Sequence, residues 1–137
     1  MELRKVEKAF EDDRGSIADI FYKEKLDHVA IIKTNSGNFI RGNHYHKLTT
    51  QHIFMTKGKL RYWYKDSKDK TNNPPKSVLV DEGYVVKTTP LEVHALEMLG
   101  ESEFIVFSTG IRGGMDYESD TYRDIVILTP DMLQSNG

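Results

Sequence analysis

The sequence contains no cysteine among its 137 residues. A disulfide framework and thiolate metal sites are therefore excluded, so a metal would have to be held by histidine, amide or carboxylate groups. No apolar run approaches the ~20 residues that a membrane-spanning helix requires. The first residues, Met1 to Lys5, also lack the apolar segment of a secretory signal. We therefore expect a cytoplasmic protein with no membrane partner.

An excess of charge of one sign is lacking as well. The 19 basic residues oppose 21 acidic ones, and the formal net charge is −2. A nearly balanced chain gives no electrostatic reason to expect nucleic acid as a partner. The 38% apolar and 29% charged residues are typical of a soluble domain with a modest core. We expect one domain over residues 1–137, with its core at about 4–128 and a short tail at 129–137.

Long amphipathic helices are the third absence, and short runs of strand-forming residues take their place. Most runs end at a turn signal, such as Asn-Ser-Gly at 35–37 or Asp-Glu-Gly at 81–83. Many short strands separated by turns indicate an antiparallel barrel or sandwich. The expected strands are 6–10, 16–22, 27–34, 41–46, 51–57, 59–65, 78–80, 84–88, 93–99 and 103–109, with an exposed loop at 66–76 and a short helix near 131–134.

One stretch, Arg41 to Gly58, gathers most of the side chains capable of chemistry. On a strand, His44 and His46 project to the same face because successive side chains alternate. Gln51 opens the next strand, and His94 begins a later one. We therefore expect these three histidines and the glutamine to meet as a polar cluster inside an otherwise apolar barrel.

These residues belong to two spaced motifs, which are Gly37, His44, His46, Gln51 and Gly58, and then Gly83, Pro90 and His94. Their order resembles the two motifs of the cupin superfamily, in particular its RmlC-like branch. The resemblance covers residues 37–96, a little under half of the chain. It implies an all-β, single-domain cupin jelly-roll β-barrel.

Within that superfamily, a narrower resemblance can be given. The segment Arg41-Gly42-Asn43-His44-Tyr45-His46, followed by Gln51, resembles the dTDP-sugar 3,4-ketoisomerases. Asp13-Arg14-Gly15 is similar to a segment that these enzymes share with dTDP-4-dehydrorhamnose 3,5-epimerases, which have glutamine in place of His46. Asp120-Thr121-Tyr122 resembles instead the cupin half of capsular-polysaccharide reductases, whose histidines hold zinc. All three groups act on nucleotide-linked sugars or in their pathways.

The resemblance and the cluster together predict a nucleotide-sugar isomerase or epimerase of surface-polysaccharide biosynthesis, acting on a 4-keto-6-deoxy sugar. Such a reaction requires a base that removes the proton beside the carbonyl and a group that stabilises the enolate. Imidazole suits the first task because its pKa lies near cellular pH, and a guanidinium suits the second. The predicted catalytic residues are His44, His46 and Arg41, and the predicted substrate-binding residues are Arg14, Gln51, His94 and Tyr122.

Three alternatives stay open. In a metal-binding cupin, His44, His46, Gln51 and His94 would hold zinc, iron or nickel. Metal cupins usually carry glutamate where this chain has an uncharged glutamine, so we expect no metal and no other cofactor. The second alternative is a cupin that binds a sugar nucleotide without catalysis, and the third is a purely structural histidine cluster.

We also expect a homodimer. A chain this short buries a limited core, and its first strands are suited to pair with the sheet of a partner and so cover an exposed edge.

Overall fold

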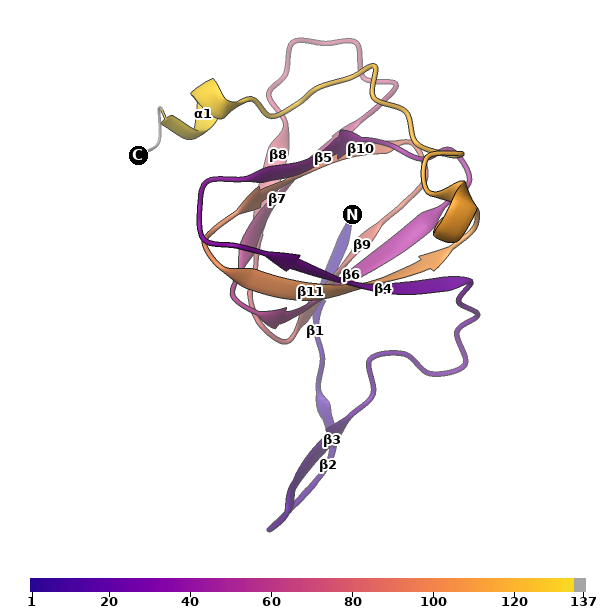
Figure 1. The fold of residues 1–137 in the computed structure, drawn as a ribbon, viewed down its shortest axis with the longest axis vertical. Helices are drawn as coiled ribbons and strands as arrows, with labels where there is room; N and C mark the ends of the chain where they lie inside the picture. Colours follow the sequence, from indigo (N-terminus) through magenta and orange to yellow (C-terminus); the bar gives the residue numbers. More distant parts are fainter. Residues whose placement is uncertain (135–137) are drawn as a thin grey trace.

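The computed structural model describes residues 1–134, which fold almost entirely into strands. Figure 1 shows them gathered around one core, with a hairpin extending from the body. No helix within this range is long and apolar enough to cross a membrane. The elements are β1 (Glu2–Lys5), β2 (Lys8–Asp12), β3 (Gly15–Ala18), β4 (His28–Thr34), β5 (Ile40–His44), β6 (Thr50–Lys57), β7 (Leu60–Asp66), β8 (Lys76–Val80), β9 (Tyr84–Thr88), β10 (Glu92–Met98), β11 (Ser102–Thr109), a 3-10 helix (Gly114–Asp116) and α1 (Pro130–Gln134).

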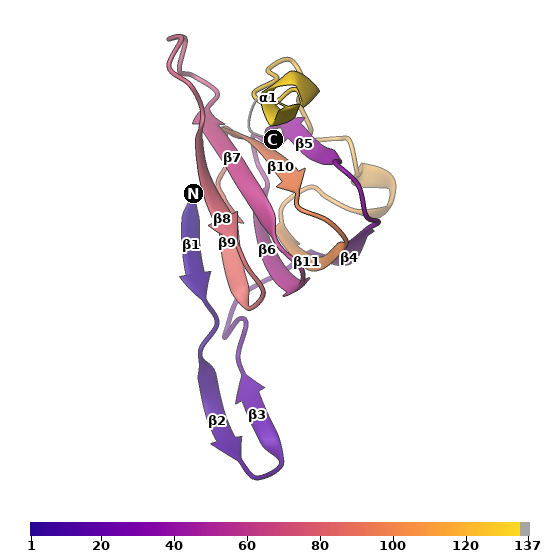
Figure 2. The same ribbon diagram turned by 90° about the vertical axis from the view of Figure 1, so that its left-hand side faces the viewer.

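The body consists of two antiparallel sheets that face each other (Figures 1 and 2). One sheet has the strand order β1-β9-β6-β11-β4, and the other has the order β5-β10-β7-β8. In both sheets, strands distant in sequence are neighbours, as in β10 between β5 and β7. This order is that of a jelly roll, so the expected all-β jelly-roll fold is confirmed. Within residues 1–134 no ladder joins the two sheets, and β4 and β5 are edge strands.

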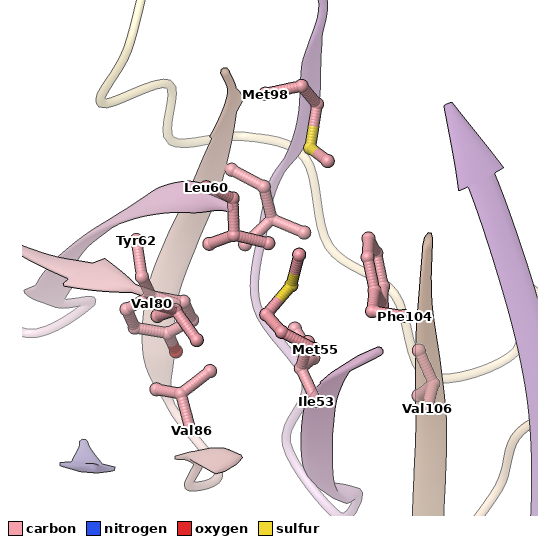
Figure 3. Close-up of a cluster of buried hydrophobic side chains, with 10 residues drawn as sticks. Ile53, Met55, Leu60, Tyr62, Val80, Val86, Met98, Phe104 and Val106 are labelled. Carbon is pink, nitrogen blue, oxygen red and sulfur yellow. The ribbon is translucent and has the colours of Figure 1, made fainter. Parts of the chain in front are cut away.

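The core lies between the sheets (Figure 3). Alternate residues of β6 and β11 are buried because successive side chains of a strand point to opposite faces. The largest fully buried side chains of residues 1–134 include Met55 of β6, Phe104 of β11 and Tyr62 of β7. The Tyr62 hydroxyl contacts Thr88 Oγ1 at 2.6 Å and donates to Glu92 Oε1 at 2.7 Å, so its polar end is satisfied inside the core.

Two elements near the N-terminus differ from the sequence prediction. The polar segment Glu2–Lys5 was not expected as a strand, yet it forms β1 because the edge of β9 offers it a ladder. Conversely, the strand expected over 16–22 ends at Ala18. Beyond Ala18 the chain leaves the hairpin, and the Phe21 ring packs edge-on against His52 and Phe107. Apolar contact with the main sheet therefore outweighs continuation of a two-stranded ladder.

The hairpin β2–β3 projects away from the two sheets (Figures 1 and 2). Its residues are all exposed, including the apolar side chains of Phe10 and Ile17. An isolated two-stranded hairpin is only marginally stable in water. The hairpin is therefore the part of the described chain with the least support from its own core.

Candidate active site

Strands β5, β10 and β6 bring three histidines and one glutamine together. His44 ends β5, and its backbone is paired with that of His94 in β10. His46 follows just beyond β5, and Gln51 comes from β6 in the opposite sheet. The ring centroids of the three histidines lie 4.6 to 5.5 Å apart. The structure thus brings together four of the residues selected from the sequence, and all four are buried.

A bulge at the end of β5 aims His44 inward. Gly42 and Asn43 have φ values of 83° and 60°, and the register with β10 shifts between His94 and Ala95. A Cβ atom at Gly42 would lie 3.0 Å from the carbonyl oxygen of His94, so the close approach of the strands requires glycine there. The expected strand 41–46 is consequently cut short at His44.

A cavity of about 140 Å³ lies beside the cluster. This volume is below the ~300 Å³ of typical small-molecule pockets, so it suits a single ring and not a complete nucleotide sugar. The polar residues that line it are Arg41, His44, Gln51, His94 and Arg112, and the others are Ile32, Gly42, Ile53, Leu96, Phe104 and Val106.

Arg41 is held at the edge of this cavity. Its Nε donates to Thr34 Oγ1 at 2.9 Å, and its Nη2 donates to the carbonyl oxygen of Lys33 at 3.1 Å. A guanidinium has five N–H groups, so this anchoring leaves others for an anionic ligand.

Two further arginines, which the sequence analysis did not select, reach the cluster from the segment after β11. Arg112 lines the cavity, and its Nη1 donates to the Tyr117 carbonyl oxygen at 2.8 Å. Arg123 donates from Nη1 to Nδ1 of His44 at 3.2 Å. Its Nη2 meets both carboxylate oxygens of Glu118, at 2.9 and 3.1 Å. No local pattern marks these arginines, because the contact with His44 spans 79 residues of sequence.

Asp120 fastens the same segment to the histidine loop. Its buried carboxylate accepts hydrogen bonds from the backbone N–H groups of Lys47 and Leu48 at 3.0 and 2.9 Å and from the Thr49 hydroxyl at 2.8 Å. Burial by itself would raise the pKa of Asp120, but these hydrogen bonds outweigh it and lower the pKa. Asp120 therefore holds the loop that follows His46 in place. The sequence analysis named it only within the segment Asp120-Thr121-Tyr122 and did not select it as a site residue.

The backbone partners of His46 and His94 fix the position of the proton on each ring. His46 Nδ1 donates to the carbonyl oxygen of Asp120 at 2.7 Å, and His94 Nδ1 donates to that of Glu92 at 3.3 Å. A carbonyl oxygen can only accept, so both neutral rings carry their proton on Nδ1 and a lone pair on Nε2.

His44 has the opposite tautomer. Arg123 can only donate, so Nδ1 of His44 must accept and the ring proton lies on Nε2. The cluster therefore contains one imidazole N–H and two imidazole lone pairs within a few ångströms. Such a set has both partners that a proton transfer needs.

All three imidazoles are held in the neutral form. Burial lowers the pKa of His44 to about 2, with further lowering by His94, His46 and the guanidinium of Arg123. Burial likewise lowers the pKa of His94 to about 3, and it lowers the pKa of His46. For each charged imidazolium, the free energy lost on leaving water exceeds the stabilisation that its hydrogen-bond partners provide.

Gln51 Oε1 lies 3.3 Å from Nε2 of His46. Because this nitrogen bears no proton, a hydrogen bond between the two requires the amide to present its NH₂ group, which a half-turn of the side chain gives. A glutamate at this position would have no donor to offer.

Two residues selected from the sequence, Arg14 and Tyr122, do not line the cavity in this chain. Arg14 lies at the tip of the β2–β3 hairpin, where it forms an exposed ion pair of 2.7 Å with Asp12. The Tyr122 ring stacks on Tyr45 at 5.4 Å, beneath the ammonium group of Lys47 at 4.2 Å. The isolated bridge between Tyr45 and Tyr122 places both rings on the face opposite the histidines, as strand alternation requires.

The zinc implied by the resemblance to capsular-polysaccharide reductases fits this arrangement only in part. The ligand atoms of the three histidines lie within 4.8 Å of one another, and His46 and His94 present Nε2 lone pairs. His44 does not, because its Nδ1 accepts from Arg123 and its Nε2 carries the proton. A metal ligand must offer a lone pair, so the three histidines as arranged do not fit a metal.

The fold and the histidine cluster together define a small cupin of the jelly-roll type, as the sequence motifs predicted. The chain belongs to the polysaccharide biosynthesis C-terminal domain family, whose sequence profile matches residues 10–122. A search of curated protein sequences returns no match.

Solved structures with this fold include enzymes of nucleotide-sugar metabolism. A sugar 3,4-ketoisomerase from Thermoanaerobacterium thermosaccharolyticum, in complex with TDP, is 16% identical with a TM-score of 0.70, over 98% of this chain and 92% of that one. A 3,4-ketoisomerase from Helicobacter canadensis is 16% identical with a TM-score of 0.72, over 90% of each chain. A dTDP-4-dehydrorhamnose 3,5-epimerase from Sulfolobus tokodaii is 21% identical with a TM-score of 0.66, over 87% of this chain and 73% of that one. At these identities the likeness establishes the fold.

Proposed function

We propose that this protein is an isomerase or epimerase of a nucleotide-linked 4-keto-6-deoxy sugar, working without a metal. One observation carries the proposal. One imidazole with its proton on Nε2, His44, lies against two imidazoles with Nε2 lone pairs, His46 and His94, and His44 and His94 line a small cavity together with Arg41 and Arg112.

In the proposed mechanism, Nε2 of His94, or Nε2 of His46 when its hydrogen bond with Gln51 opens, removes the proton from the carbon beside the carbonyl. The electron pair of that C–H bond moves to the carbonyl oxygen and forms an enolate. The Nε2–H of His44 and the guanidinium of Arg112 stabilise its negative charge. Return of the proton to the same carbon from the other face gives epimerisation. Return to the former carbonyl carbon, with transfer of the neighbouring hydroxyl proton to the former carbonyl oxygen, leaves the carbonyl on the neighbouring carbon and gives isomerisation.

The charges around the cavity suit an anionic substrate. Burial is the main cause of the lowered pKa of His44 in the free protein, and the charges of Arg123 and Arg112 lower it further. A bound diphosphate would offset these cations, so the imidazoles would become stronger bases when the substrate is present. The cavity volume of about 140 Å³ suits the sugar ring alone, which leaves the nucleotide outside.

The comparisons support the class of substrate. A variant of the Thermoanaerobacterium thermosaccharolyticum enzyme, 16% identical to this chain, has been solved with TDP-4-keto-6-deoxyglucose. The family match adds a link to polysaccharide biosynthesis. We propose the same kind of ligand here, in a homodimeric protein.

Solvent-deuterium exchange at the carbon beside the carbonyl, followed by NMR, tests the proposal. Wild-type protein is incubated in D₂O with the 4-keto-6-deoxy sugars of TDP, UDP and GDP. We expect exchange with at least one of them and a loss of 10²- to 10⁴-fold on His46→Asn or His44→Asn, the range typical of a lost acid or base. His52→Asn is the matched control, because His52 packs against Phe21 outside the cavity. Equal rates in wild type and both variants would refute the enzyme, and tight binding without exchange would indicate a non-catalytic sugar-nucleotide binder.

A further inference from the structure

Within residues 1–134, Arg123 is the cationic side chain that hydrogen-bonds to a histidine of the cluster. The Nη2 of its guanidinium contacts both carboxylate oxygens of Glu118 in an exposed ion pair, and its Nη1 donates to Nδ1 of His44. A planar guanidinium held in this way points its N–H groups in a set direction. The contact is partly buried, so water competes with it less than with a surface pair.

The contact matters because His44 differs from the other two histidines only through it. His46 and His94 each donate from Nδ1 to a backbone carbonyl oxygen and present Nε2 to the cluster. Without Arg123, His44 is free to move its proton to Nδ1. Each imidazole would then carry its lone pair on Nε2. One ring nitrogen of each histidine lies within 4.8 Å of the others, and three neutral imidazoles this close suit Zn²⁺.

We propose that Arg123, held by Glu118, is a positioning residue that fixes the tautomer of His44, making the cluster a proton-transfer site in place of a divalent-metal site. Two physical effects act together. The hydrogen bond keeps the proton on the nitrogen that faces the cavity, and the fixed positive charge repels a dication. The catalytic half of this inference rests on the proposed function, whereas the tautomer and the metal preference do not.

A merely structural role for Arg123, as the ion-pair partner of Glu118, predicts different results. Loss of that pair would change the free energy of unfolding and leave the His44 tautomer and the zinc affinity unchanged. The tautomer therefore separates the two roles, and it can be observed on the full chain without substrate.

The experiment compares wild type with Arg123→Leu, Arg123→Lys, Glu118→Gln and the control Arg61→Leu. Arg61 is remote from the cluster and donates to Ser77 on the neighbouring strand. Long-range ¹H–¹⁵N NMR reports which nitrogen of His44 is protonated, and calorimetry with Zn²⁺ reports the affinity. Circular dichroism establishes that each variant is folded, and Glu118→Gln keeps the test available if the leucine variant does not fold.

We expect the proton of His44 on Nε2 in wild type and in Arg61→Leu. In Arg123→Leu we expect it to shift to Nδ1, and zinc affinity to rise 10- to 100-fold, the range found when groups that orient metal ligands are changed. Glu118→Gln should give a smaller shift in the same direction, and Arg123→Lys should restore part of the wild-type behaviour. An unchanged tautomer in Arg123→Leu, or wild type binding zinc as tightly as that variant, would overturn the inference. Absence of deuterium exchange in wild type, with the NMR and zinc results as expected, would instead refute the proposed function alone.

Discussion

At the residue scale, the neutral imidazoles predict how stability depends on pH. The pKa of His44 is lowered to about 2 and that of His94 to about 3, while an unfolded histidine has a pKa near 6.5. Below pH 6.5 the unfolded chain therefore binds more protons than the folded one, so stability is complete above 6.5 and falls as the pH drops. At pH 5 the expected loss is about 2 kcal/mol for each of the two imidazoles.

Urea unfolding between pH 5 and 7.5 measures this dependence. Most carboxylates stay ionised over this range because their pKa values lie near 4. In His94→Asn the slope of the unfolding free energy against pH should decrease by the contribution of one imidazole. A variant with the wild-type slope would mean that His94 is not held neutral in the folded protein.

At the element scale, the Asp120 carboxylate is the buried side-chain anchor that joins the segment 110–124 to the histidine loop. Asp120→Ala removes an acceptor and leaves the backbone N–H groups of Lys47 and Leu48 without their partner. Both hydrogen bonds are partly buried, and a donor left unsatisfied in a fully buried site costs about 1 to 3 kcal/mol. We therefore expect a loss of roughly 1 to 3 kcal/mol in unfolding free energy. The segment that carries Arg112 and Arg123 should also loosen.

Urea unfolding measures the first effect, and hydrogen exchange of the Lys47 and Leu48 amides measures the second. Asp116→Ala is the matched control, because Asp116 lies in the same segment with an exposed side chain. If both substitutions have the same small effect, Asp120 does not anchor the segment.

At the scale of the whole molecule, exposed apolar side chains predict a second copy of the chain. Phe10 and Ile17 on the projecting hairpin are 52% and 60% exposed, and Val29 and Ile31 on edge strand β4 are 55% and 57% exposed. An open edge strand with apolar side chains favours pairing with another chain. In a dimer, the β2–β3 hairpin of one chain, with Arg14 at its tip, could contact the surface of the other chain.

Sedimentation equilibrium at micromolar concentration should therefore give twice the 15.8 kDa mass of the chain. The double substitution Phe10→Ser and Ile17→Ser should shift the protein toward the monomer. Replacing the exposed Leu48, which lies at the other end of the fold, by serine provides the control. A wild-type protein that sediments as a monomer would contradict the dimer.

The sequence by itself determined most strands and the meeting of the histidines. Strand alternation and turn residues are local signals, and the expected strand 84–88 coincides with β9. The motif spacing that resembles cupins placed His44, His46, Gln51 and His94 in one cluster, as the structure has it.

Only the tertiary structure decided what surrounds that cluster. The contacts of Arg123 with His44 and of Asp120 with His46 join residues 79 and 74 positions apart. No periodicity predicts such pairs, because they depend on how the chain after β11 packs across β5. The same holds for Tyr122, which the bridge with Tyr45 turns away from the cavity. The tautomers of His44 and His46 are likewise tertiary properties, since they are set by the donor or acceptor that folding places beside Nδ1.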